Sequence, residues 1–554
     1  MVSKFIERAK NGESIFISEI RDAFLSIDTV VGCYIETATG QKYSRFIPLP
    51  QTECPEEAEF VRDYFYANIY NMISAFGGKY MKLRVNKNNG FIVDLCESLN
   101  SVFQVDMSRA ERHGYGKSLN VTDRVNASAG FPPFYFEIIF NEDIGNIGDD
   151  VFCPVVDEIS DPVSLFKCAV DKACDTTLIG LDIGGTDIKA VVSVNGKIVA
   201  FKEYDWDPAN MTKITQLTDA VKALVVELCA VLGEDNKPDA IGVGFPDVVL
   251  NNKIVGGETL KTRGIRLASP DYEAEFAQLL DFNDMLRGFC KPGGVVSMTN
   301  DGFLAAYTAA VEIAHSDHPE EVEDGIFAHT LGTELGTGWI DETGEIPQIP
   351  LEIYACVIDT GNFPAREYEP FDLRSCLNFN TNLPGTMQKY ASQSGAYRLA
   401  LEYFLKDAPH LYDELFDKKF VEEKNGGIYV SLLPEDMRKP FLAYIMKLAD
   451  EGQPQAEQVF RETGKYMAAT WKETEFLLRP KVNERILYGR FVKSTKCMSL
   501  MQEGAQEILD ITMKAGDDDL AFTPLMKELK KNPDYTVAQF GQAIGSLYFA
   551  AKNL

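Results

Sequence analysis

Residues 178–192, LIGLDIGGTDIKAVV, decide the fold of the chain. Two apolar runs of strand length flank the pair Gly184 and Gly185, which predicts two strands joined by a tight turn. Glycines let a backbone turn sharply and bring its amide N–H groups close to an anion. The pattern therefore indicates a phosphate-binding turn, although a plain hairpin turn would contain the same glycines.

The polar residues of this stretch are candidate ligands. Thr186 adds a hydroxyl donor beside the glycines, and Lys189 closes the motif. Asp182 stands at the end of the first strand, where its carboxylate could hold a metal-bound water. These residue types suit a polyphosphate and its cation better than an apolar ligand.

Strands and helices alternate after this stretch. A helical pattern at 212–233 is followed by an apolar strand at 239–250, and a second strand at 295–300 leads directly into a helix at 301–314. The last third is mostly helical, interrupted by a strand and a glycine turn at 484–492. This alternation is typical of an α/β architecture.

A second glycine-rich turn lies at 331–338, LGTELGTG. It includes Gly332, Thr333 and Gly336, and a strand precedes and follows it. It is neither a P-loop, since G-K-[ST] is missing, nor a dinucleotide fingerprint, since no helix opens after it. Two such turns about 150 residues apart suggest two half-domains that grip one nucleotide.

Asn300 and Asp301 lie between the two turns, at a strand-to-helix junction. A carboxylate there can accept the proton of a substrate hydroxyl that attacks a γ-phosphoryl group. Asn and Asp are also favoured helix N-caps. The junction is thus a candidate catalytic base with a neighbouring substrate ligand, or a helix cap.

Composition excludes several classes of protein. The 554 residues carry 54 Lys and Arg against 83 Asp and Glu, a net charge of −29. Such a chain repels phosphate backbones and anionic lipid. It contains no stretch long and apolar enough to span a membrane, no signal-peptide pattern, and eleven scattered cysteines without C-x-x-C. We expect a cytoplasmic protein with reduced thiols and no nucleic-acid or membrane partner.

Residues 1–175 form a separate α+β region in this interpretation. Apolar spacing predicts a helix at 57–74, and Asn89-Gly90 within 82–95 predicts a hairpin between two alternating runs. The aromatic stretch 132–140 predicts another strand. No motif in this region can be attached to a reaction, so its role stays open.

Taken in order, the motifs of residues 176–554 resemble the ROK family of sugar kinases and sugar-responsive regulators. The stretches that carry the resemblance are 178–192, 241–249, 296–310, 330–340, 383–396, 486–492 and 538–551. It implies an α/β, two-lobed ribonuclease H-like kinase fold of the actin and hexokinase type. It also implies Asp301 as catalytic base, Asn300 and Glu352 as sugar ligands, Gly489 beside the adenosine, and ATP with Mg²⁺ as cofactors.

The chain departs from the family pattern at several positions. Ala355 replaces the histidine of the family zinc motif, Thr386 replaces its last cysteine, and no C-x-C occurs. We therefore expect no zinc site. Glu334 and Arg490 replace glycines beside the phosphates and the adenine, and Asp247 replaces another glycine. These changes leave the phosphoryl donor and the efficiency of catalysis open.

The sequence thus predicts three domains. Residues 1–175 form an accessory α+β domain, 176–300 with 535–554 form a small lobe, and 301–534 form a large lobe. The expected activity is ATP-dependent phosphorylation of a hexose or hexosamine hydroxyl by a cytoplasmic enzyme, and a homodimer is possible. The alternative is a sugar-binding regulatory or scaffold protein with weak or no catalysis. A DNA-binding repressor is disfavoured, because residues 1–175 contain no recognisable basic helix-turn-helix.

Overall fold

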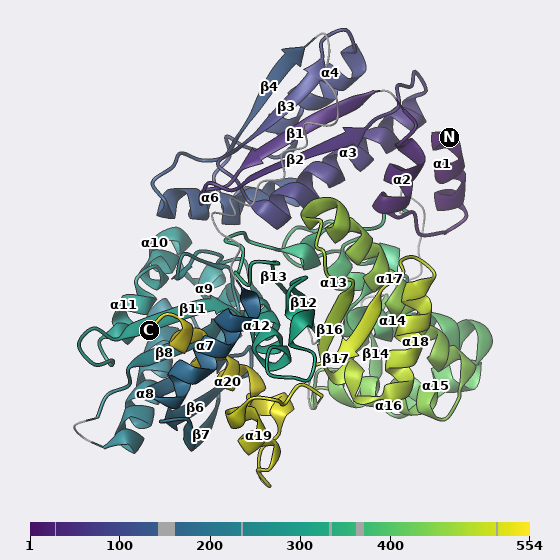
Figure 1. The fold of residues 1–554 in the computed structure, drawn as a ribbon. Coiled ribbons are helices and arrows are strands. Elements are labelled where there is room, and N and C mark those ends of the chain that lie inside the picture. The colour runs from purple at the N-terminus through teal and green to yellow at the C-terminus, as the bar shows by residue number, and fades with distance from the viewer. Residues whose placement is uncertain are drawn as a thin grey trace.

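The computed structural model describes residues 1–27, 29–141, 161–233, 236–331, 335–361, 371–424, 426–516 and 519–554. An N-terminal α+β domain lies over two α/β lobes that stand side by side (Figure 1). This arrangement confirms the predicted two-lobed α/β fold. Among the described residues, no helix combines the length and the apolar character that crossing a membrane requires.

The N-terminal domain is built on a four-stranded sheet of order β2-β1-β3-β4. Only β3 and β4 pair in parallel. The strands are β1 (Val30–Glu36), β2 (Lys42–Pro48), β3 (Tyr80–Asn86) and β4 (Tyr135–Asn141). The helices are α1 (Val2–Lys10), α2 (Ile17–Phe24), α3 (Pro55–Phe76), α4 (Gly90–Glu97), α5 (Leu99–Val102), η1 (Gly114–Lys117) and α6 (Ser118–Ser128).

The hairpin predicted at Asn89-Gly90 is wrong. Strand β3 ends at Asn86 and helix α4 begins at Gly90. The Asn89 side chain accepts a hydrogen bond from the Ile92 amide at 3.3 Å, so this residue caps a helix. Asn favours both helix caps and hairpin turns, and here the apolar face that α4 buries decides for the helix.

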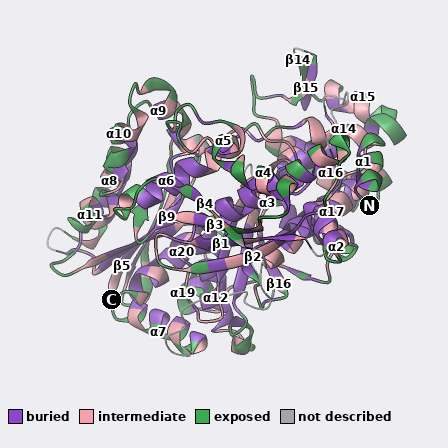
Figure 2. Cartoon of the chain, turned by 90° about the horizontal axis from the view of Figure 1, so that it is seen from above, coloured by how far each residue is buried: buried purple, intermediate pink, exposed green. Residues whose placement is uncertain are grey.

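The N-terminal domain shares one hydrophobic core with the large lobe. Helix α3 is buried over most of its length, and Figure 2 shows buried residues concentrated where it lies. A buried ion pair of 2.7 Å joins Arg21 of α2 to Glu473 of α17 (Pro454–Leu478). The domain is therefore packed into the molecule as a structural part of it.

The small lobe contains a five-stranded sheet of order β11-β8-β5-β6-β7. Strands β11, β8 and β5 are parallel, and β6 and β7 continue the sheet antiparallel. Its strands are β5 (Thr177–Ile183), β6 (Asp187–Val194), β7 (Lys197–Asp205), β8 (Ala240–Phe245) and β11 (Val295–Asn300), with a short hairpin of β9 (Val249–Leu250) and β10 (Lys253–Ile254). The helices are η3 (Pro208–Asn210), α8 (Ile214–Leu232), η4 (Leu260–Thr262), α9 (Arg263–Ala268), α10 (Tyr272–Phe276), η5 (Ala277–Leu279) and α11 (Phe282–Arg287).

The last helix, α20 (Val537–Lys552), returns to pack on this sheet. A Cβ atom on Gly242 of β8 would lie 1.8 Å from the Ser546 carbonyl oxygen of α20, so only glycine allows the two backbones to meet. Helix α7 (Pro162–Cys174) packs on α20 as well. Helix α7 thus packs on α20 and also contacts α12 (Asp301–Ile313) and η6 (Pro319–Val322), although the sequence analysis placed it in the N-terminal domain.

The large lobe contains a four-stranded sheet of order β13-β12-β16-β17. Strand β12 pairs antiparallel with β13 and parallel with β16. The strands of this lobe are β12 (Ile326–Leu331), β13 (Leu335–Ile340), β14 (Val421–Lys424), β15 (Gly427–Val430), β16 (Glu484–Gly489) and β17 (Thr512–Ala515). Its remaining helices are α12 (Asp301–Ile313), η6 (Pro319–Val322), η7 (Ile353–Ala355), η8 (Leu373–Ser375), α13 (Met387–Tyr390), α14 (Gln393–Asp407), α15 (Pro409–Asp417), α16 (Arg438–Asp450), η9 (Arg490–Lys493), α18 (Thr495–Gln506) and α19 (Pro524–Lys530).

Candidate active site

The Asn300-Asp301 junction is where β11 ends and α12 begins. Both side chains accept from the Gly302 amide at 2.8 Å, through Asn300 Oδ1 and Asp301 Oδ1. The helix-cap interpretation is therefore correct, and it leaves a catalytic role open. A Cβ atom on Gly302 would lie 2.5 Å from the Thr337 carbonyl oxygen, so glycine lets the start of α12 press against β13.

Asn300 is fixed from its other end as well. Its Nδ2 donates to the main-chain carbonyl of Asp247 at 3.0 Å. The buried Asp247 carboxylate accepts from the amides of Val248 and Gly257, each at 2.8 Å. Burial raises the pKa of Asp247 to about 6, and those two amide bonds oppose the rise. The sequence analysis noted Asp247 only because it departs from the family pattern. In the structure its carbonyl holds Asn300 and its carboxylate holds the 256–258 loop.

The first glycine turn connects β5 to β6 as predicted. The Gly184 amide donates to the Asp187 carbonyl at 2.8 Å, and Trp206 Nε1 donates to the Gly184 carbonyl at 3.0 Å. Gly185 and Thr186 are exposed at its tip. The turn is thus held rigid from both sides, with its tip open to a ligand.

Asp182 and Lys189 face a cleft between the two lobes. The pKa of Asp182 is raised to about 7, chiefly by burial and also by the charges of Asp301 and Asp187, while the ammonium of Lys189 opposes the rise. Lys189 also forms an ion pair with Asp187. The charge of Asp301 thus contributes to the raised pKa of Asp182.

The second glycine turn is described only in part. Gly332, Thr333 and Glu334 lie outside the described residues. The Gly336 amide donates to Thr330 Oγ1 at 3.1 Å. Gly489 is paired with Leu331 and has φ +108°, and a Cβ atom on it would lie 2.4 Å from the Leu331 carbonyl oxygen. Gly489 therefore closes the β12–β16 end of the cleft, where a side chain would not fit.

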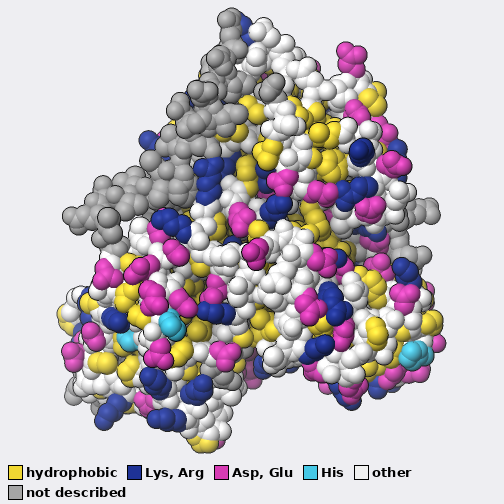
Figure 3. Space-filling view, turned by 45° about the vertical axis from the view of Figure 1, so that its right-hand side comes forward, with side chains coloured by type: hydrophobic (Ala, Val, Ile, Leu, Met, Phe, Trp, Pro, Cys, Tyr) yellow, Lys and Arg dark blue, Asp and Glu magenta, His cyan; other side chains and the backbone are white. Residues whose placement is uncertain are grey.

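The cleft has a volume of about 1020 Å³, counting space open to solvent. Lys189, Arg490 and Lys493 line it with Asp182, so its described charged groups are mostly cationic. This contrasts with the net charge of −29 for the whole chain. On the face seen in Figure 3, acidic side chains are scattered among basic ones without a continuous basic area. The cationic lining therefore suits a bound polyphosphate.

Helix α20 closes the far wall of the cleft. Gln542 of this helix lines it, and its Oε1 is buried without a hydrogen-bond partner among the described residues. The sequence analysis singled out neither Lys493, which follows the 486–492 stretch, nor Gln542, which lies within the 538–551 stretch but was given no role. The signal available for Gln542 was a polar residue on a mostly apolar helix that returns to the cleft.

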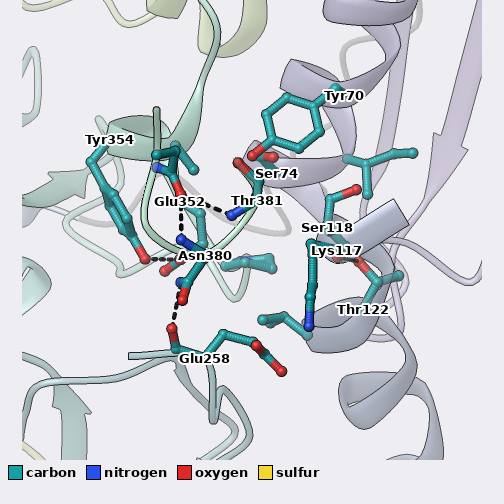
Figure 4. A pocket seen from close by; sticks show the side chains of 15 residues that line it. Tyr70, Ser74, Lys117, Ser118, Thr122, Glu258, Glu352, Tyr354, Asn380 and Thr381 are labelled. Carbon is teal, nitrogen blue, oxygen red and sulfur yellow. Dashed lines mark hydrogen bonds between the residues drawn. The ribbon is translucent and has the colours of Figure 1, made fainter. Parts of the chain in front are cut away.

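Glu352 lies in a second, smaller pocket of about 500 Å³, again counting space open to solvent (Figure 4). Its amide donates to the Ser74 carbonyl of α3 at 3.0 Å, and the Tyr354 hydroxyl donates to its carboxylate. The pocket is lined by Tyr70, Ile73, Ser74, Lys117, Ser118, Val121, Thr122, Glu258, Pro350, Glu352, Tyr354, Ala355, Asn378, Asn380 and Thr381. The lining is rich in hydroxyl and amide groups, which suits a polyhydroxylated ligand.

Asn300 and Asp301 do not line this pocket, but they are connected to it. The connection runs from Asn300 through Asp247 to Gly257, whose neighbour Glu258 faces the pocket. A Cβ atom on Gly185 would lie 3.4 Å from Lys261 Cε, so the same loop also reaches the first phosphate turn. One loop therefore lies between the two cavities.

The region of the family zinc motif holds Cys356, Cys376, Thr386 and Ala355. Both cysteines are buried and reduced. Burial raises the pKa of Cys356 well above its ordinary value. Within the described ranges, no group of three or more His, Cys, Asp or Glu side chains is arranged to hold a metal ion. The expectation of no zinc stays a prediction.

The chain was compared with known proteins. No family model and no curated protein matches the chain. Similar solved structures include a ROK family glucokinase from Streptomyces griseus in complex with glucose and AMPPNP (18% identity, 68% of this chain and 98% of that chain, TM-score 0.39). They also include a ROK hexokinase from Thermus thermophilus (14%, 67% and 98%, 0.39) and a glucokinase from Balamuthia mandrillaris in complex with glucose (14%, 67% and 99%, 0.41).

Proposed function

We propose that this protein is an ATP-dependent kinase that transfers a phosphoryl group to a hydroxyl of a monosaccharide. The observation that carries the proposal is the position of the Asn300-Asp301 junction. Asp301 acts electrostatically on Asp182 in the cation-lined cleft. Asn300 is tied through Asp247 to the loop that borders the hydroxyl-rich pocket. The junction thus connects a donor site with an acceptor site.

In this proposal Asp301 is the general base. Its carboxylate accepts the proton of the attacking sugar hydroxyl, and Asn300 and Glu352 hold the sugar through hydrogen bonds. The glycine turns at 184–186 and around 336, with Gly489 and Lys189, hold the nucleotide. Movement of the lobes toward each other would exclude water and favour transfer over hydrolysis.

The donor side suits Mg²⁺. Asp182 offers a hard oxygen ligand, and burial together with the charges of Asp187 and Asp301 already disfavours its ionised form. A divalent cation would relieve that repulsion. Mg²⁺ usually keeps several waters and takes its other ligands from phosphates, so one carboxylate is enough. Bound Mg²⁺ would supply charge neutralisation on the transferred phosphoryl group.

Sugar-stimulated ADP formation tests the proposal. A panel of hexoses, hexosamines and N-acetylated sugars is assayed with ATP and Mg²⁺, and the product is identified by phosphorus NMR. We expect at least one sugar to stimulate ADP release and to yield a sugar phosphate. If no sugar stimulates turnover while sugars still raise the melting temperature, the catalytically weak sugar-binding protein is the better account.

A further inference from the structure

The N-terminal domain forms one wall of the pocket that contains Glu352. Helix α3 contributes Tyr70 and Ser74, and Lys117 and Thr122 come from the start and middle of the η1–α6 segment. Figure 4 shows Lys117, Ser118 and Thr122 on one side of the pocket and Glu352 and Tyr354 on the other. The pocket therefore exists only because residues 1–130 pack against both lobes.

The same domain also holds the opposite walls in place. The carbonyls of Ser74 and Ala75, in the last turn of α3, accept from the amides of Glu352 and Leu351 at 3.0 and 2.9 Å. Arg124 of α6 is buried and donates to the Gly256 carbonyl at 2.6 Å. The geometry of the acceptor pocket thus depends on two helices to which the sequence analysis assigned no function.

The charges around the pocket balance. Arg124 pairs with Glu258 at 3.0 Å and with Glu273 at 2.6 Å. Glu273 also pairs with Arg109. Two arginines thus neutralise the two acids on the small-lobe side. Lys117 is the cation among the described lining residues, and Glu352 is the remaining acid. No ion pair of the Lys117 ammonium is recorded within the described part of the chain. Lys117 is partly buried and extends toward the side of the pocket where Glu258 lies (Figure 4).

We propose that Lys117 is a specificity-determining residue that makes this pocket select a neutral monosaccharide over a positively charged amino sugar. The inference rests on the proposed function, since it concerns the acceptor of the same reaction. With Lys117 charged, the pocket has no net charge, and its carboxylates and amides can accept hydrogen bonds from sugar hydroxyls while Lys117 donates one. An ammonium group on the sugar would be repelled by Lys117. Without Lys117, the carboxylate of Glu352 would attract the ammonium group of the amino sugar.

The test is the selectivity of Lys117→Met. kcat/KM is measured for a neutral hexose and for the corresponding 2-amino-2-deoxyhexose below the pKa of its amine. We expect the hexose-to-hexosamine ratio to fall by about tenfold or more, since one unit charge in a partly buried site changes binding by that order. The control is Lys4→Met, an exposed lysine on α1, which should leave the ratio unchanged. A change in folding alone would lower both values together.

The outcomes separate the two proposals. If the wild type phosphorylates sugars and Lys117→Met keeps the wild-type ratio, the specificity inference is wrong and the kinase proposal stands. If the wild type turns over no sugar, the kinase proposal fails. The specificity inference is then tested by calorimetry, as the ratio of the hexose and hexosamine affinities in the wild type and in Lys117→Met. Binding of neither sugar would overturn both.

Discussion

Acid should destabilise the large lobe through His329. This histidine lies on β12, one residue before Thr330, and is completely buried. Trp471 Nε1, which can only donate, donates to His329 Nε2 at 2.8 Å. The proton of the neutral ring must therefore be on Nδ1, which donates to Thr337 Oγ1 at 3.1 Å. A second proton on Nε2 would place two N–H donors face to face.

The size of the acid destabilisation follows from the pKa of His329. Burial and, to a smaller extent, the charge of Arg485 lower the pKa of His329 to about 3, whereas an unfolded histidine titrates near 6.5. Below pH 6.5 the unfolded chain binds a proton at this site and the folded chain does not. The contribution of the neutral His329 to the free energy of unfolding is thus fully present above pH 6.5. It is lost as the pH falls, by about 1.4 kcal/mol per pH unit. The loss reaches about 3 kcal/mol at pH 4.

The assay compares the wild type with His329→Gln, which keeps an acceptor for Trp471 but does not titrate. The stability difference between them, from urea unfolding followed at the large lobe, should narrow by about 3 kcal/mol between pH 7.5 and pH 4. Since the chain has only five histidines, nitrogen NMR can identify the signal that the variant lacks and show that it stays neutral above pH 4.5. The exposed His318→Gln is the control. A His329 signal that titrates near pH 6.5, or a constant stability difference, would refute the reasoning.

Three further perturbations test other parts of the account. Gly242→Ala forces a Cβ atom to within 1.8 Å of the α20 backbone, so the free energy of unfolding should fall by at least about 2 kcal/mol, while Gly90→Ala, with open space around it, should change it little. Gln542→Leu removes the buried amide oxygen that faces the cleft, and should raise KM for ATP about fivefold without changing KM for the sugar; an unchanged KM would remove this residue from the site. Arg21→Met leaves Glu473 buried without its ion-pair partner, so the free energy of unfolding should fall by about 3 kcal/mol. Limited proteolysis should then cut the N-terminal domain sooner than in the wild type. Equal cleavage rates would contradict this.

Local patterns made the two lobes predictable. The turn at Gly184 and Gly185, the junction at Asn300 and Asp301, and the β12–β13 pair each combine strand, turn and cap signals within a few residues. Each of them lies at the end of a strand, a position that a sequence can indicate. The fold class and these positions were therefore accessible before the structure.

The pocket that contains Glu352 could not be predicted in the same way. Ser74 and Glu352 are 278 positions apart, and their backbone hydrogen bond depends on how α3 packs on the large lobe. Lys117 and Thr122 belong to no motif, so nothing in their neighbourhood indicated a ligand. At Asn89 two local preferences competed, and only the buried face of α4 decided between them. Residues 1–175 thus gained a role only from long-range packing.

The central claim is that Asp301 takes the proton from the sugar hydroxyl. The most direct measurement is the single-turnover rate of phosphoryl transfer to the preferred sugar in Asp301→Asn, with sugar and ATP affinities measured alongside. Asp161→Asn, at the N-cap of α7, is the control because it changes the same kind of helix-capping residue far from the proposed chemistry. The account predicts a rate lower by about 10²- to 10⁴-fold in Asp301→Asn with affinities within a few fold of the wild type. Transfer by Asp301→Asn at a rate close to that of the wild type would contradict it.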